Sequence, residues 1–141
     1  MDLTDGEFEQ LLALRTGLRR FTHWSEEQAK AAGITPAQHQ LLLAIRGYPE
    51  PAGPTIGELA GYLLLRPHST SELIDRAVTA GLVTRHADAT NASIVRVVLT
   101  PLGGERLRGL SHAHLQELAE LGPTMRTLWH AIEQFEQQRE S

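Results

Sequence analysis

The sequence of 141 residues contains no cysteine. Disulfide bonds, thiolate metal ligands and thiol-based redox sensing are therefore excluded. It also lacks the run of about 18 apolar residues that a membrane-spanning helix requires. The N-terminal stretch MDLTDGEFEQ is acidic and does not have the basic-then-apolar order of a secretion signal. We therefore expect a cytoplasmic protein with no membrane partner.

The sequence also lacks the common catalytic motifs. It has no nucleophile elbow, no HExxH and no phosphate-binding glycine loop, and PLGGERL lacks the strand and lysine context of a P-loop. Seven histidines are present, but His112 and His114 are two residues apart, whereas ligands on one helix face are three or four apart. We expect no enzyme, no cofactor and no metal site.

Excess positive charge is absent as well. The formal net charge is -4, and the segment from Thr55 to Thr100 contains four arginines against four acidic residues. A protein that coats nucleic acid indiscriminately is usually basic. If DNA is the partner, the positive patch must therefore be local and the long-range attraction weak.

Signals for helix starts recur along the chain. Thr35 with Gln38 and Thr55 with Glu58 have the spacing of capping boxes, and Thr100 precedes another proline. The β-branched runs LVTRH and IVRVVLT flank the turn-prone ADATNAS and predict a two-stranded hairpin. The expected elements are helices over 5–32, 36–46, 56–64 and 67–80, the hairpin, and helix from 101 onward with a break at Gly122-Pro123.

Apolar stripes mark both ends of the chain. Their three-and-four spacing lines up one helix face for packing against other helices. One interpretation is packing within the chain, and the other is pairing with a second copy to form a homodimer. We predict dimerisation through these residues, which are Leu11, Leu14, Leu18, Leu121, Met125, Leu128, Ile132 and Phe135.

Helix, tight turn, helix and hairpin form the order of a winged helix-turn-helix, whose second helix enters the DNA major groove. In the segment 67–80, Leu73, Ile74, Ala77 and Val78 predict the buried side. The opposite side is either simply solvated or reads DNA. The candidate DNA-binding residues are Arg66, His68, Ser69, Ser71, Glu72 and Arg76.

Two acidic residues of this segment have alternative interpretations. Asp75 is predicted to form an orienting salt bridge with Arg76 rather than to read a base. Glu72 either accepts a hydrogen bond from a cytosine amino group or completes a capping box with Ser69.

The chain resembles the MarR family of bacterial transcription regulators over nearly its whole length. The matching stretches are GITPAQHQLLLAI, TIGELAGYLLLRPHSTSELIDRAVTAGLVTR and VRVVLTPLGGERL. The resemblance implies a mainly α fold with a small β-hairpin wing, in which residues 35–100 form the winged helix-turn-helix. It also implies that residues 1–34 and 101–141 form a helical dimerisation region, and that the dimer reads a pseudo-palindromic operator in double-stranded DNA.

The wing departs from the family pattern. The family's D-x-x-D-R-R, whose arginine enters the minor groove, falls here on DATNAS, where Asn91, Ala92 and Ser93 replace one acid and both arginines. The remaining candidate contacts in the wing and its strands are Arg85, Asn91, Ser93 and Arg96, the two arginines through phosphates.

The resemblance further implies a small aromatic or anionic effector. The residues expected to line its pocket are Phe21, His23, Trp24 and His39, although these are also consistent with ordinary core and surface positions. The function predicted from the sequence is a DNA-binding transcription regulator, a repressor that the effector releases from DNA. The alternative is a winged-helix dimer that has lost DNA reading and serves as a protein-interaction or ligand-binding module.

Overall fold

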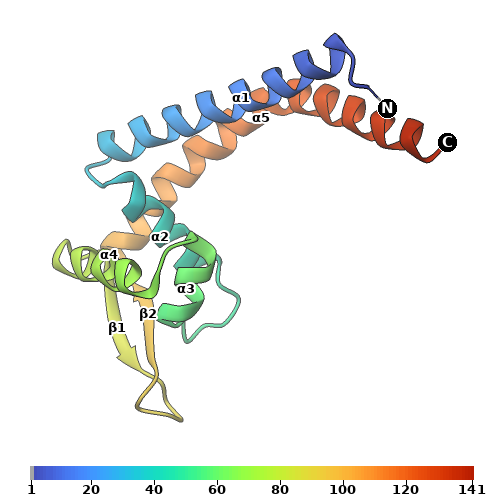
Figure 1. Ribbon diagram of the computed structural model, residues 1–141. Coiled ribbons are helices and arrows are strands. Elements are labelled where there is room, and N and C mark those ends of the chain that lie inside the picture. The colour runs from blue at the N-terminus through green and yellow to red at the C-terminus, as the bar shows by residue number, and fades with distance from the viewer. Residues whose placement is uncertain (1) are drawn as a thin grey trace. The chain divides into compact units, whose positions relative to one another are not determined.

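A computed structural model describes residues 2–141 and contains five helices and one antiparallel hairpin (Figure 1). Mainly helical structure with a small hairpin wing was predicted, and it is confirmed. The first four helices and both strands end within one residue of their expected limits. The elements are α1 (Asp5–Ala31), α2 (Pro36–Gly47), α3 (Ile56–Leu63), α4 (Pro67–Thr79), β1 (Val83–Ala87), β2 (Val95–Leu99) and α5 (Pro101–Glu140).

The expected break at Gly122-Pro123 is wrong, because α5 continues through Pro123. Proline removes one backbone donor and crowds the preceding turn, which costs about 3 kcal/mol in a helix interior. The helix has 40 residues, so many intact hydrogen bonds flank this position. In the following turn the Thr127 hydroxyl donates to the Pro123 carbonyl at 3.1 Å. Pro123 therefore did not end the helix, although the Gly-Pro dipeptide predicted a break.

The chain divides into two compact units. The helical unit comprises residues 1–27 and 112–141, and the winged unit comprises residues 28–111. The division falls inside α1 and inside α5, so each long helix contributes to both units. The limits of the winged unit are thus wider than the 35–100 expected for a DNA-binding domain, because the ends of the two long helices help to build its core.

Capping boxes set the starts of α2 and α3. The Thr35 hydroxyl accepts from the Gln38 amide at 3.0 Å, and the Gln38 side chain accepts from the Thr35 amide at 3.0 Å. Thr55 and Glu58 repeat this reciprocal pair at the start of α3. Both boxes were predicted from their spacing, and they satisfy amide donors that have no partner within the helix.

The core of the winged unit lies between α2, α3, α4 and the hairpin. Residues from both flanking long helices complete it, which explains the wide limits of this unit. Burial of these apolar side chains is the main term that stabilises the unit. The buried cluster consists of Ala29, Ile34, Leu41, Leu42, Ile45, Leu59, Leu73, Ile74, Ala77, Leu82, Val83, Val97, Leu107 and Leu110.

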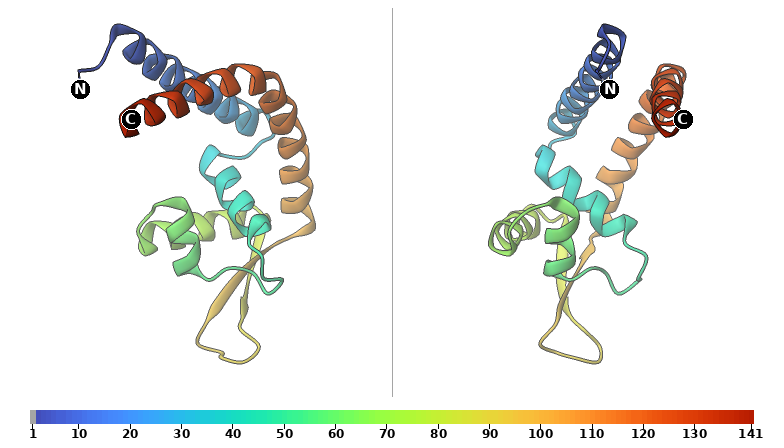
Figure 2. Two further views of the ribbon diagram at one scale, coloured as in Figure 1. Left: turned by 90° about the vertical axis from the view of Figure 1, so that its right-hand side faces the viewer. Right: turned by 45° about the vertical axis from the view of Figure 1, so that its right-hand side comes forward.

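The hairpin is anchored at its base and projects away from α2, α3 and α4 in each view of the winged unit (Figure 2). Val83 pairs with Leu99 at the base and Ala87 with Val95 at the far end. The loop before α3 adds to the ladder, because the Val97 amide donates to the Pro54 carbonyl at 3.0 Å. A Cβ at Gly53 would lie 2.3 Å from the Val97 carbonyl oxygen, so only glycine fits this approach.

The turn between α3 and α4 contains a leucine in an unusual conformation. Leu64 has φ 54° and ψ 41°, the left-handed region, and its side chain is 91% exposed. The cost of this conformation for a residue with a Cβ is roughly 1–2 kcal/mol. Its amide donates back to the end of α3, which shortens the connection to α4. The strained conformation of Leu64 therefore allows α4 to begin only a few residues after α3 ends.

In the helical unit, the expected apolar stripes are only half buried. Residues Leu121, Met125, Leu128, Ile132 and Phe135 are of intermediate exposure. Two stripe residues of α1, Leu11 and Leu14, line one apolar hollow together with Ile132 and Phe135 of α5. Packing within the chain is thus part of their role. No helix among the described residues is long and apolar enough to cross a membrane.

Candidate nucleic-acid interface

The helix α4 has one buried and one exposed side. Its buried residues are Thr70, Leu73, Ile74 and Ala77. Thr70 is polar, and its hydroxyl donates to the Arg66 carbonyl at 2.9 Å, which satisfies it inside the core. Three of the four residues predicted for this side are buried, but Val78 is 38% exposed and was assigned wrongly. Its position is at the edge of the stripe, near the end of the helix.

Arg66 occupies the N-cap position of α4, with Pro67 at the first helical position. No side chain caps this end, so the capping box between Ser69 and Glu72 is wrong. The reason is that Ser69 lies inside the first turn rather than before it. The uncapped amide groups of the first turn and the exposed hydroxyl of Ser69 are left available at this end.

Glu72 instead pairs with a histidine one turn earlier. The His68 Nε2 atom lies 3.2 Å from the Glu72 carboxylate, and the two side chains are 87% and 53% exposed. An exposed pair at this spacing contributes a few tenths of a kcal/mol at most. The pair therefore does little for stability, and both groups can exchange partners when another molecule approaches.

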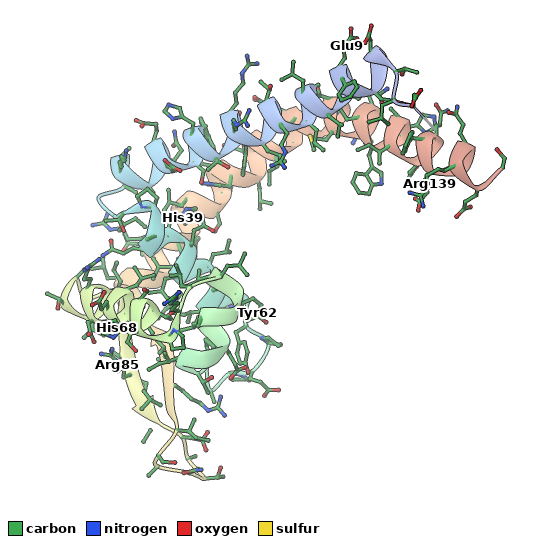
Figure 3. The ribbon with its side chains drawn as sticks, in the orientation of Figure 1. Glu9, His39, Tyr62, His68, Arg85 and Arg139 are labelled. Carbon is green, nitrogen blue, oxygen red and sulfur yellow. The ribbon has the colours of Figure 1, made fainter. Side chains whose placement is uncertain are left out.

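Asp75 pairs with an arginine of the neighbouring strand. The Arg85 guanidinium donates to the Asp75 carboxylate, and the same nitrogen lies 3.5 Å from the Ser71 carbonyl oxygen. The predicted salt bridge between Asp75 and Arg76 is therefore wrong, because consecutive helix residues point in different directions. Figure 3 labels His68 on α4 and Arg85 on β1, the two elements that this ion pair connects.

The arginines at the two ends of α4, unlike Arg85, have no ion-pair partner among the described residues. Among residues 2–141, the side chains of Arg66 and Arg76 form no ion pair and no hydrogen bond, and both residues are exposed. They are ten positions apart, which corresponds to roughly 15 Å along a helix. The exposed side of α4 thus has a free cation at each end and paired side chains between them. Ser71 lies between them at intermediate exposure.

The loop between the strands is organised around one carboxylate. One Asp88 oxygen accepts from the Thr90 amide, the Thr90 hydroxyl and the Asn91 amide at 3.1, 2.8 and 3.0 Å. The other oxygen accepts from Arg96 Nε at 2.6 Å. The Arg96 guanidinium, followed by the Thr90 donors, holds the pKa of the Asp88 carboxyl well below its ordinary value of 3.8.

Arg96 is held near the far end of the strands, where the tip loop begins, and it is not free at the surface. Its side chain is 22% exposed, and its Nη1 atom donates to the Gly53 carbonyl at 2.9 Å. The neighbouring Glu58 accepts from the Tyr48 hydroxyl, which lowers the pKa of Glu58 and raises that of Tyr48. Sequence spacing did not reveal these partners, since Gly53 is 43 positions from Arg96.

The wing tip has no cation. Asn91, Ala92 and Ser93 are exposed, and the Asn91 side-chain oxygen accepts from the Ser93 amide at 3.1 Å and from the Ser93 hydroxyl at 2.6 Å. The tip is thus a closed polar turn. It presents neutral groups where a charged contact to the minor groove would require arginine.

The residues expected to line an effector pocket are divided between the two units. In the helical unit, the ring centroid of His114 lies 5.8 Å from that of Phe21 and 4.8 Å from that of Trp24. The His114 Nε2 atom is 2.7 Å from the Ser25 hydroxyl oxygen. His23 is exposed in the same unit. His39 belongs to the winged unit, where it is 3% exposed.

Sequence reasoning missed the contact between His114 and Ser25, because these two residues are 89 positions apart. The described residues contain no group of three or more histidine or acidic side chains able to hold a metal ion.

Residues 32–92 match the model of the MarR family. No curated protein matches the chain. Among solved structures, a MarR family transcription regulator shares 22% identity with a TM-score of 0.77, covering 95% of this chain and 89% of its own. MarR from E. coli in its apo form shares 21% identity with a TM-score of 0.69, covering 95% of this chain and 98% of its own.

The transcriptional repressor CouR, bound to a 23-mer DNA duplex, shares 24% identity with a TM-score of 0.68, covering 94% of this chain and 96% of its own. At these identities the likeness establishes the fold. The predicted winged-helix architecture is thereby confirmed, and the family model supports the resemblance over residues 32–92. Two of these three proteins are named as a transcription regulator and a transcriptional repressor.

Proposed function

We propose, because residues 32–92 match the model of the MarR family, that this chain is a homodimeric transcription regulator that reads double-stranded DNA. It acts in the cytoplasm as a repressor, and a small aromatic or anionic effector releases it from a pseudo-palindromic operator. In this function α4 is the recognition helix. His68, Ser69, Ser71 and Glu72 face base edges, while Arg66 and Arg76 contact phosphates.

The observation that carries the proposal is the exposed side of α4 with its free cation at each end. A helix with its side chains is about 10–12 Å wide and fits a major groove about 12 Å wide. Arginines roughly 15 Å apart along such a helix reach the backbones on opposite sides of the groove. Between them, the groups on the helix surface are donors and acceptors suited to base edges.

Unburied apolar side chains in the helical unit support the homodimer. Several large hydrophobic residues on α1 and α5 are about half exposed or more in a single chain, which a second copy would cover. A two-fold dimer presents two recognition helices, so the operator it reads has two related half-sites. These side chains are Phe8, Leu11, Leu12, Leu18, Leu115, Leu118 and Trp129.

The rings of Phe21, Trp24 and His114 support an aromatic effector. Two aromatic faces and a histidine within 6.0 Å of one another form a surface on which a planar ring can stack. A ligand with different affinities for two arrangements of the dimer shifts the population between them. DNA affinity and effector affinity are then coupled by the same free energy.

Selection from random duplex DNA tests the proposal. The purified protein should enrich a palindromic motif with half-sites about one helical turn apart, and fluorescence anisotropy should show affinity that falls with salt. The double variant His68→Ala, Ser69→Ala should lose discrimination between selected and scrambled duplexes, while Arg139→Ala on α5 serves as the control. Binding without sequence preference would overturn the proposal.

A second candidate function is a protein-interaction or ligand-binding module, and the cation-free wing tip favours it. The variants Ala92→Arg and Ser93→Arg separate the two functions. A DNA reader should gain affinity for its operator from the added charge in the minor groove. A module that has abandoned DNA should bind no duplex tightly before or after the substitution.

A further inference from the structure

The side chain of Asn91 has a fixed orientation at the tip of the wing. Its oxygen faces inward and accepts from the amide and the hydroxyl of Ser93. Because the Ser93 amide is a donor, the opposite orientation would place two donors against each other. The Nδ2 group of Asn91 therefore faces away from these bonds, and among residues 2–141 it has no hydrogen-bond partner.

Hydrogen bonds to Asp88 fix the turn that contains Asn91. The Asn91 amide donates to Asp88, and Asp88 is in turn held by Arg96, whose guanidinium is also bonded to the Gly53 carbonyl. The Asp88 and Arg96 side chains are only 12% and 22% exposed. The exposed amide group is thus connected through hydrogen bonds to the body of the winged unit. A donor held in this way loses little conformational entropy when it binds.

We propose that Asn91 is a minor-groove reader, donating from Nδ2 to the acceptor atoms of an A·T base pair beside the groove occupied by α4. This inference rests on the proposed function and adds a neutral specificity contact to it. The minor groove of an A·T or T·A pair presents only the acceptors adenine N3 and thymine O2. An amide NH2 has two donors and matches these acceptors.

The same chemistry disfavours G·C pairs. Guanine adds its N2 amino group to the minor groove, and this donor faces the donors of Asn91 without a matching acceptor. The contact carries no charge, so it contributes specificity without adding to the counterion release that governs salt dependence. The wing tip then reads a base pair by hydrogen bonding, although it has no arginine.

Operators containing base analogues isolate this contact. At each position flanking the selected half-site, the natural pair is compared with G·C and with inosine·C. The inosine pair has the major-groove edge of G·C but lacks the minor-groove amino group. At one position in each half-site, binding should be as tight with inosine·C as with A·T and about threefold to tenfold weaker with G·C, the range expected for one neutral hydrogen bond.

The matched variant is Asn91→Asp, which retains the inward oxygen that accepts from Ser93 and removes the NH2 donors. It should lose the preference for inosine over guanine, and any remaining difference should favour guanine, because the outward carboxylate oxygen can accept from the guanine amino group. Asn91→Ala should also lose the discrimination, without a change in the slope of affinity against salt. Ser93→Ala keeps the Asn91 amide and the Ser93 backbone donor, and it should retain the discrimination.

The outcomes separate this inference from the proposed function. If the wild-type protein selects an operator but binds the inosine and guanine duplexes equally at every flanking position, Asn91 is not a minor-groove reader and the proposed function stands. The same conclusion follows if Asn91→Asp discriminates as the wild type does. If no operator is selected at all, the proposed function itself fails. Thermal unfolding of each variant verifies that the fold is retained.

Discussion

Replacing Arg76 by alanine gives the sharpest test of how α4 contacts DNA. Arg66 and Arg76 are the two cations of the recognition helix without an ion-pair partner among the described residues, so a homodimer has four such groups. Each phosphate neutralised adds about -0.9 to the slope of log affinity against log salt concentration, so four contacts give a slope of about -3.6.

The variant Arg76→Ala removes two of the four contacts, so the slope of log affinity against log salt concentration should become shallower, at about -1.8. Between 50 and 200 mM salt the wild-type affinity should decrease by about 150-fold, and that of Arg76→Ala by about 12-fold. Arg66→Ala should give the same slope as Arg76→Ala, because each arginine contacts one phosphate per chain in the proposed function.

The assay is fluorescence anisotropy of a labelled operator, titrated with protein at several salt concentrations in that range. Arg139→Ala, near the C-terminal end of α5 in the helical unit, removes an equal charge and should leave the slope at the wild-type value (Figure 3). If Arg76→Ala and Arg139→Ala have the same slope, Arg76 does not contact phosphate, and the placement of α4 in the groove is refuted.

Three further predictions follow from the charged groups and the strained turn. Asp75→Asn releases Arg85 from its ion pair, so affinity for unrelated duplex DNA should rise and the salt slope should steepen, as anisotropy would show; an unchanged slope would mean that Arg85 cannot reach phosphate. Because the pKa of Asp88 is lowered when folded, its stabilising bonds are complete above pH 3.8 and disappear as the pH falls toward the lowered value. Over that interval the protection of the Thr90 and Asn91 amides, relative to the intrinsic exchange rate at each pH, should fall, and Asp88→Asn should remove this change in protection. Leu64→Gly should raise the free energy of unfolding by about 0.5–1 kcal/mol in urea denaturation, since relief of left-handed strain exceeds the entropy cost of glycine, whereas Leu65→Gly, in the same turn, should not.

Local signals in the sequence were sufficient for the helix starts. The capping boxes at Thr35 and Thr55 involve residues three positions apart, and the hydrogen bonds depend only on that spacing. Periodicity also predicted Leu73, Ile74 and Ala77 on the buried side of α4, but it wrongly added Val78 and did not predict Thr70. Pro123 shows the limit of such signals, because the number of intact helical bonds around a proline is not visible in the dipeptide itself.

The partners of the charged residues were not predictable from spacing. Asp75 was expected to pair with its neighbour Arg76, but the arginine that reaches it is on β1, ten positions away. Arg96 was expected to contact phosphate, and the structure shows it joined to Asp88 and Gly53 near the far end of the strands. Both partnerships depend on how the hairpin packs against the helices. That packing is a property of the folded chain.

These partnerships also explain how a segment with equal numbers of positive and negative groups can present free cations. Of the four arginines between Thr55 and Thr100, Arg85 and Arg96 are neutralised by acids that the fold brings to them, while Arg66 and Arg76 have no acidic partner among residues 2–141. Few cations mean weak binding to arbitrary DNA, since that binding is almost entirely electrostatic. Hydrogen bonds to base edges then contribute a larger share of the operator affinity. A neutral donor such as Asn91 fits this balance, because it raises the affinity for one sequence without raising the affinity for all others.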